Sequence, residues 1–273
     1  MSLHNVNVKF VVRGLLFALP VAAITTVVIL RLMVTQSWIY PFPAPTPLPP
    51  TLLVPRGELP AGPGGLEEWV QARDKPYVLA GSGFLLALDD GEVVGVTTAH
   101  SVPFGNPAHP VERIALRVAG QAEFVAEFDT LRGRPGRPFA GDNLALAYVL
   151  LWIDRPPGAD LLLTPDPRGA PQPGERVLLF SGLGDGHGGR CILEGTVQSV
   201  SDTAVWVVMD GWFAPGSMSG SPLVSQHTGQ VVGMAIAVSP RRNRLLLGAH
   251  PIGSIVQLAE SAAEFPKIRE YRR

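Results

Sequence analysis

Three short segments of this chain carry residues that could act together in nucleophilic catalysis. Ser219 lies in the turn-forming segment GSMSGSP, just before an apolar stretch. His100 follows the apolar run VVGVTTA, and Asp142 precedes the run NLAL. A serine hydroxyl is a weak nucleophile unless a base removes its proton, and histidine is a common base. The segments therefore predict a catalytic set of His100, Asp142 and Ser219, in the chain order found in one class of serine hydrolases.

The position of the acid has two solutions in the sequence. Asn143 stands directly before the apolar run, and Asp142 stands one residue further away. If residues 144–153 form a strand, a shift of one residue turns a side chain to the other face. A β-bulge would return Asp142 to the site. We expect Asp142 to be the acid, with Asn143 as the alternative.

No metal or other cofactor is expected from the sequence. The six histidines and the single cysteine, Cys191, do not form a cluster with the spacing of metal ligands. A lone cysteine also cannot form an internal disulfide. The formal net charge is −1, so the chain has no basic footprint for nucleic acid.

Several motifs occur together in the order found in trypsin-like serine proteases. They are Gly81-Ser82-Gly83-Phe84, Thr98-Ala99-His100, Pro173-Gly174-Glu175 and Gly229-Gln230-Val231-Val232-Gly233, which follows Ser219. The chain resembles the chymotrypsin-fold family, and in particular its bacterial disulfide-free branch, similar to high-temperature-requirement proteases. The resemblance implies two antiparallel six-stranded β-barrels, with the site in the cleft between them. A PDZ domain is not expected after the C-terminal helix.

The resemblance also assigns the oxyanion hole and the substrate pocket. The oxyanion hole would use the backbone N–H groups of Ser217 and Ser219. The family has glycine at the first of these positions, and serine resists the backbone angles that glycine adopts freely. The pocket would be lined by Phe213, Ala237 and Val238. No acid lies there, so a small or apolar substrate side chain is expected.

Composition and patterning support an all-β domain. The chain has 30 glycines and 27 prolines in 273 residues, which favours short strands joined by turns. Strands are predicted at 77–88, 92–98, 114–118, 122–128, 144–153, 176–182, 191–200, 204–209, 223–224, 231–238 and 244–249. Helices are predicted at the segment containing Leu66, Trp69 and Val70, and at 252–264.

The N-terminal part predicts a membrane anchor. Residues 14–30 carry no charge, and Lys9, Arg13 and Arg31 flank them. We expect a transmembrane helix at 13–34, a cytoplasmic segment at 1–12 and a proline-rich stalk at 35–63. The protease domain, at 64–273, would then lie in the periplasm, held by a single pass through the cell inner membrane. A cleaved signal peptide is the alternative.

These features predict a membrane-anchored serine endopeptidase that acts on protein or peptide substrates and binds no nucleic acid. The alternative is a catalytically inactive protease-fold domain that binds peptides or partner proteins. Two features leave this alternative open. Ser217 stands where the family has glycine, and either Asp142 or Asn143 could occupy the position of the acid.

Overall fold

The computed structural model describes most of the chain after residue 51. The described residues are 52–55, 58–60, 64–106, 108–139, 141, 143–183, 191–214, 216–241 and 244–271. The predicted cytoplasmic segment 1–12, the predicted anchor 13–34, most of the predicted stalk and Asp142 lie outside them. Within the described ranges, no helix is long and apolar enough to span a bilayer.

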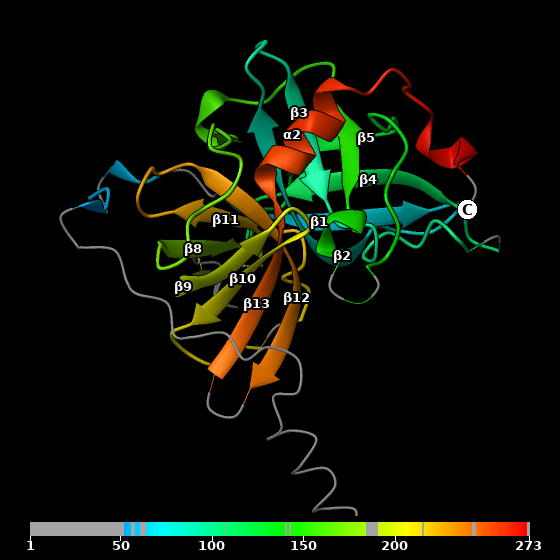
Figure 1. The fold of residues 1–273 in the computed structure, drawn as a ribbon. Coiled ribbons are helices and arrows are strands. Elements are labelled where there is room, and N and C mark those ends of the chain that lie inside the picture. The colour runs from blue at the N-terminus through cyan, green and yellow to red at the C-terminus, as the bar shows by residue number, and fades with distance from the viewer. Residues whose placement is uncertain are drawn as a thin grey trace, which may run out of the picture. The chain divides into compact units, whose positions relative to one another are not determined.

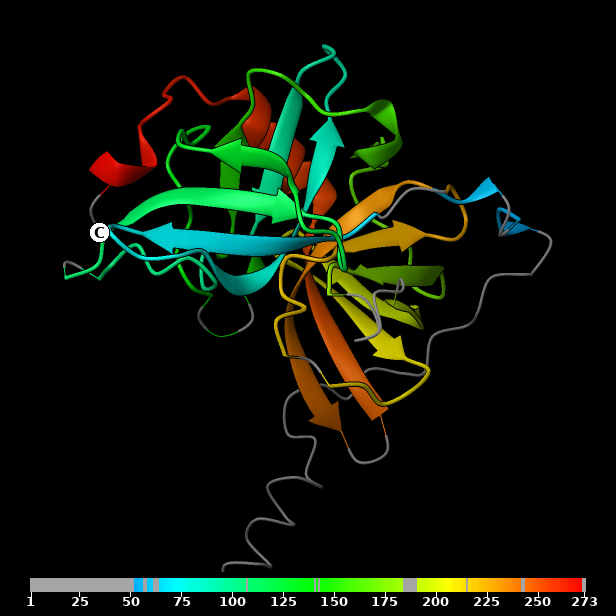
Figure 2. The same ribbon diagram turned by 180° about the vertical axis from the view of Figure 1, so that it is seen from behind.

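Strands of the N-terminal half form one sheet, in the order β5-β4-β1-β2-β3-β6. Figure 2 shows β1 and β4 side by side in this sheet. The strands are β1 Leu66–Ala72, β2 Val78–Ala87, β3 Val93–Thr97, β4 Val111–Arg117, β5 Phe124–Phe128 and β6 Val149–Trp152. A short strand, β7 Leu162–Leu163, pairs with β2 in parallel. This sheet is barrel-like, as predicted, but it has seven strands with one parallel pair instead of six antiparallel strands.

Strands of the C-terminal half close into a six-stranded barrel, in the order β10-β13-β12-β11-β8-β9 (Figure 1). They are β8 Arg176–Ser181, β9 Cys191–Ser201, β10 Ala204–Met209, β11 Pro222–Ser225, β12 Val231–Arg241 and β13 Arg244–Pro251. This confirms the predicted second barrel. The two sheets belong to one compact unit, which among the described residues excludes only Pro240 and Arg241.

One α-helix follows the second barrel. It is α2 Ile252–Glu260, and short 3-10 helices occur at η3 Leu144–Leu146, η4 Ala159–Leu161 and η5 Ile268–Glu270. The predicted C-terminal helix is confirmed, but it ends four residues early. At its end the Ser261 hydroxyl donates to the Gln257 carbonyl oxygen at 2.7 Å.

The helix predicted around Leu66, Trp69 and Val70 is wrong, because these residues form β1. Leu66, Glu68 and Val70 alternate into the interior, and all three are buried. Over so short a segment, positions 66, 69 and 70 fit the helical period of about 3.6 residues, and positions 66 and 70 also fit the strand period of 2. Pairing with β2 on one side and β4 on the other supplies hydrogen bonds that override the local preference.

The strand predicted at 144–153 begins later than expected. Leu144–Leu146 form η3, and β6 covers only Val149–Trp152. The N–H groups of Leu144 and Ala145 donate to the Thr203 carbonyl oxygen at 3.1 and 3.0 Å. These bonds take the place of strand pairing. Residues 144–146 are therefore not a strand, and the alternation of side chains along a strand cannot be used to choose between Asp142 and Asn143.

A shared apolar core connects the two sheets. Phe84 of β2 and Phe180 of β8 belong to one buried cluster, at 0% and 1% exposure. Ile252 and Ile255 of α2 belong to the same cluster. Burying a phenylalanine side chain stabilises the folded state by roughly 1.5–3 kcal/mol. The helix is therefore packed against residues from both halves.

The motif Pro173-Gly174-Glu175 supplies a buried acid to an ion-pair cluster. Arg168 Nη2 lies 2.6 Å from Asp166 Oδ2 and 2.9 Å from Glu175 Oε1. The Ser225 hydroxyl, at the end of β11, also donates to Glu175. The cluster fixes the end of the strand that follows the predicted nucleophile.

The described residues before position 61 contact the second barrel. Val54 N–H donates to the Gln226 carbonyl oxygen at 2.6 Å. The Nδ1 atom of His227 lies 2.6 Å from the Leu52 carbonyl oxygen, which can only accept, so Nδ1 carries the proton. Leu59 packs against the shared core. The predicted boundary at residue 64 stays a prediction.

Candidate active site

His100 lies in the turn that follows β3. All five residues of β3 are buried, and so are Thr98 and Ala99, whereas His100 is exposed. Its ring meets the ring of Phe139 edge-on, with 5.9 Å between centroids. Although the residue as a whole is exposed, partial desolvation of its imidazole ring lowers the pKa of His100 below its ordinary value. The imidazole is therefore neutral at pH 7, which is the form that can accept a proton.

Ser219 lies in the tight turn before β11. Gly220 N–H donates to the Ala235 carbonyl oxygen on β12 at 2.8 Å. The Ser219 hydroxyl donates to the Ile236 carbonyl oxygen at 3.2 Å. Among the described hydrogen bonds, none joins Ser219 to His100.

Ser82 of β2 connects the two turns. Its N–H donates to the Ser219 carbonyl oxygen at 2.9 Å, and its hydroxyl donates to the Ser217 carbonyl oxygen at 3.0 Å. Its own carbonyl oxygen accepts from Thr97 Oγ1 at 2.8 Å. Thr97 ends β3, three residues before His100. One strand residue therefore holds the serine turn on one side and the histidine turn on the other.

Gly220 permits this close approach. Its φ is +96°, and a Cβ at this position would lie 1.8 Å from the Ser82 carbonyl oxygen. No side chain can be accommodated at that distance. The glycine after Ser219 is therefore required by packing as well as by backbone angle.

Ser217 adopts the left-handed backbone conformation, with φ at +59°. This conformation is costly for a residue with a Cβ. The N–H groups of Ser217 and Ser219 donate to no other described residue. The oxyanion role of these two N–H groups stays a prediction.

The predicted acid, Asp142, lies outside the described residues. Asn143 directly precedes η3 and makes no side-chain capping bond. Its Oδ1 is buried and has no hydrogen-bond partner among the described residues. A buried amide oxygen of this kind is suited to accept a hydrogen bond. The choice between Asp142 and Asn143 stays a prediction.

A cavity of about 100 Å³ lies beside Ser219. It is lined by Met218, Ser219, Ala235, Ile236, Ala237, Val238 and Leu247. Two of the predicted pocket residues, Ala237 and Val238, thus lie beside the predicted nucleophile, while Phe213 is not among the lining residues. The described lining carries no charged side chain.

Phe213 lines a different cavity, of about 340 Å³. Its neighbours there include Ile192, Met209 and Trp212. Phe213 also packs against the core of the second barrel. From its position in the sequence alone, an aromatic residue such as Phe213 could line a substrate pocket or pack in the barrel core.

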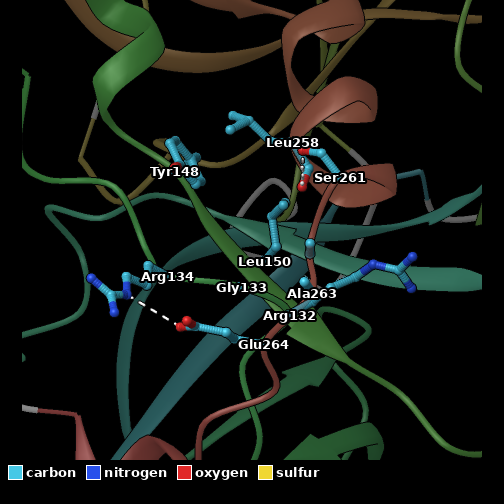
Figure 3. A pocket seen from close by; sticks show the side chains of 10 residues that line it. Arg132, Gly133, Arg134, Tyr148, Leu150, Leu258, Ser261, Ala263 and Glu264 are labelled. Atoms are coloured by element: carbon cyan, nitrogen blue, oxygen red, sulfur yellow. Dashed lines mark hydrogen bonds and ion pairs between the residues drawn. The ribbon is translucent and has the colours of Figure 1, made fainter.

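A third cavity, of about 290 Å³, contains none of the predicted site residues (Figure 3). Tyr148 and two arginines contribute to its lining. Arg134 pairs with Glu264 at 3.2 Å, and Arg132 pairs with Glu92 and donates to the Ala259 carbonyl oxygen at 2.7 Å. Both guanidinium groups therefore have acidic partners among the described residues.

Glu68 is a residue near the site that sequence reasoning missed. It is 0% exposed, and its carboxyl group lies next to residues of the turns that carry His100 and Ser219. In the helix expected from the sequence it would have been an exposed first-turn acid. The alternation of Leu66, Glu68 and Val70 was the signal that could have revealed an interior acid.

Comparisons with known proteins bear on the family and the fold of this chain. The sequence matches the trypsin-like peptidase domain model over residues 81–234. No curated protein matches it. Similar solved folds include kallikrein-related peptidase 10, with a TM-score of 0.51 and 14% identity over 72% of this chain and 93% of that chain. Another is catalytically active tobacco etch virus protease complexed with product, with a TM-score of 0.50 and 15% identity over 78% of this chain and 83% of that chain.

A bacterial structure is also similar. The serine endoprotease from Yersinia pestis aligns with a TM-score of 0.48 and 16% identity over 74% of this chain. This chain spans 65% of that protein's length. At 14% and 15% identity, the kallikrein-related peptidase and the tobacco etch virus protease show a shared fold only. The family match, however, runs from β2 to β12 and spans more than half of the sequence, so this chain belongs to the trypsin-like peptidase family.

Proposed function

We propose that this chain cleaves peptide bonds by acyl transfer, with Ser219 as nucleophile, His100 as general base and Asp142 as the acid that orients His100. The observation that carries the proposal is the double attachment of Ser82. Its hydrogen bonds to Ser219 and Thr97 hold the two catalytic turns against one strand.

The steps follow from the chemistry of these groups. The Ser219 hydroxyl must leave the Ile236 carbonyl oxygen and give its proton to His100 as Oγ adds to the substrate carbonyl carbon. The negative charge on the substrate oxygen is stabilised by the free N–H groups of Ser217 and Ser219. The C–N bond then breaks, and His100 returns the proton to the leaving amine. Water hydrolyses the acyl-enzyme by the same route.

The cavity beside Ser219 supports a preference for small, apolar side chains. Its described lining is apolar apart from Ser219, and it holds about 100 Å³. An arginine or lysine would lose its hydration there without gaining an acid partner. We therefore expect cleavage after residues such as alanine and valine, and weak cleavage after arginine, lysine or phenylalanine. A library of fluorogenic peptides that differ only at this position tests the expectation.

The uncharged run at 14–30 supports membrane anchoring, with the protease domain in the periplasm. The protein should then remain with membranes after carbonate washing, and added protease should reach the domain from the outer face only. Release of a mature form that starts between Val34 and Gly64 would point to cleavage of the segment instead.

Fluorophosphonate labelling of the full chain tests the catalytic proposal. The wild type should be labelled and should hydrolyse peptides, while Ser219→Ala should do neither. Ser221→Ala is a matched control, because it removes a hydroxyl two residues away without touching the proposed nucleophile. If the wild type folds but is not labelled, the chain is a protease-fold domain without this activity.

A further inference from the structure

Glu68 is an interior acid of the first sheet. It lies on β1, paired with Gly81 of β2 and Leu116 of β4, and it is 0% exposed. Neither carboxyl oxygen has a well-formed hydrogen bond to any described residue. A buried acid without partners is costly. Its position therefore calls for an explanation beyond packing.

Gly81 makes room for the Glu68 carboxyl group beside both catalytic turns. A Cβ on Gly81 would lie 2.8 Å from Glu68 Oε2, 3.1 Å from Ser101 Cβ and 3.2 Å from the Ser219 carbonyl oxygen. Ser101 follows His100 directly. The carboxyl group thus sits where β1, β2, the histidine turn and the serine turn meet.

The hydroxyl groups nearest to Glu68 already use their protons. Thr97 Oγ1 donates to the Ser82 carbonyl oxygen at 2.8 Å. Ser101 Oγ donates to the Thr98 carbonyl oxygen at 2.9 Å. Both hydroxyls can therefore only accept a further hydrogen bond. A protonated carboxyl has one O–H to donate, whereas a carboxylate has none.

Burial raises the pKa of Glu68 to about 8. Donation from the Ser101 and Thr97 hydroxyls to the carboxylate would lower it, but both hydroxyls already donate to carbonyl oxygens. The residue is therefore protonated at neutral pH, which agrees with the hydrogen-bond geometry.

Glu68 takes part in none of the described ion pairs. Its strand partners are a glycine and a leucine. Glu67 and Arg117 form an ion pair of 2.7 Å on the opposite face of β1. His100, next to Ser101, is the titratable group adjoining it in the turn.

We propose that Glu68 is a positioning residue of the catalytic site. Its protonated carboxyl group donates to the hydroxyls of Thr97 or Ser101, and its ionisation loosens the two turns that carry His100 and Ser219.

An ionised Glu68 competes for the protons that Thr97 gives to Ser82 and that Ser101 gives to Thr98. Loss of the first bond releases Ser82, which holds Ser219. Loss of the second opens the turn that carries His100. The inference rests on the proposed catalytic roles of Ser219 and His100.

The pH dependence of peptide hydrolysis by the full chain in detergent tests this proposal. Wild-type kcat/KM should fall above about pH 8, by about tenfold for each further pH unit if only the protonated form is active. Glu68→Gln keeps a neutral donor of the same shape, so its activity at pH 7 should be near wild type and its alkaline decline should disappear. Glu67→Gln is the matched control and should keep the decline. A Glu68→Gln enzyme that declines like the wild type overturns the proposal.

The ring proton of His100 gives a second readout that does not need activity. Its NMR shift in the wild type should show a step near pH 8, and Glu68→Gln should remove that step. If the wild type shows neither labelling nor hydrolysis at any pH, the proposed function fails, and the NMR titration still decides the role of Glu68. Identical titrations of His100 in both proteins overturn that role.

Discussion

The carbonyl oxygen of Ser219 accepts a 2.9 Å hydrogen bond from the backbone N–H of Ser82. The peptide unit of the predicted nucleophile is therefore held by a strand of the first sheet, although Ser219 itself precedes a strand of the second barrel. This attachment makes β2 part of the site without supplying any reacting group.

Removing the Ser82 hydroxyl should lower kcat markedly, while it should lower the free energy of unfolding only slightly. Ser82→Ala loses the bond to the Ser217 carbonyl oxygen but keeps the backbone bond to Ser219. A net loss of about 1 kcal/mol in the free energy of unfolding is expected. Ser201→Ala loses comparable bonds to Ala204 in the β9–β10 turn and is the control. Equal kcat values for the two variants would remove Ser82 from the positioning of the site.

Ser217→Gly should stabilise the protein. Ser217 holds φ at +59°, which glycine adopts without strain. A gain of up to about 1 kcal/mol in the free energy of unfolding is expected, measured by urea titration. Activity should persist, because only the backbone N–H is proposed to act. A less stable Ser217→Gly protein would show that the serine side chain makes a compensating contribution.

The acid is decided by variants at two adjacent positions. If Asp142 orients His100, Asp142→Asn should lower kcat by a factor on the order of 10³–10⁴ with little effect on folding. Asn143→Ala should then be mild. If Asn143 fills the position, Asn143→Asp should raise the rate, because a carboxylate stabilises the imidazolium that an amide can only orient. An unchanged rate for Asp142→Asn excludes Asp142 from the mechanism.

His250 should make the fold sensitive to acid. The residue is 0% exposed, neither ring nitrogen has a described partner, and burial lowers its pKa to about 4. In the unfolded chain the pKa is about 6.5, so the unfolded state binds more protons between these values. Stability should therefore be lost as pH falls from about 6.5 towards 4, by at most about 3 kcal/mol.

Urea unfolding at pH 7 and pH 4.5 measures this loss. His250→Phe keeps a ring beside Tyr148 and should remove the share of the acid sensitivity that His250 contributes. His109→Gln changes an exposed histidine and should leave the sensitivity unchanged. Equal losses for wild type and His250→Phe would contradict the assignment.

Much of the second barrel could be predicted from the sequence, because its strands are short apolar runs separated by turn residues. Ala204–Met209, for example, forms β10 with the predicted bounds. The errors occurred where tertiary contacts decide the backbone. β1 forms because strands pair on both of its sides, and η3 forms because Thr203 accepts its first N–H groups.

The same limit applies to the site. The segments that contain His100 and Ser219 carry local motifs that a sequence displays directly. Ser82 and Glu68 act through residues distant in sequence, so their roles depend on strand register. Gly81 lies next to Ser82 in the chain and has no side chain. The Glu68 carboxyl group occupies the space that a side chain at Gly81 would need.

The hydrogen bonds of Leu52 and Val54 to the segment that follows β11 bear on how the domain can be isolated. A recombinant fragment that starts at Gly64 would lack both bonds and the packing of Leu59, and would expose the apolar surface that Leu59 covers. A fragment that starts at Phe42 would retain them. We expect the shorter fragment to melt at a lower temperature and to aggregate more readily than the longer one.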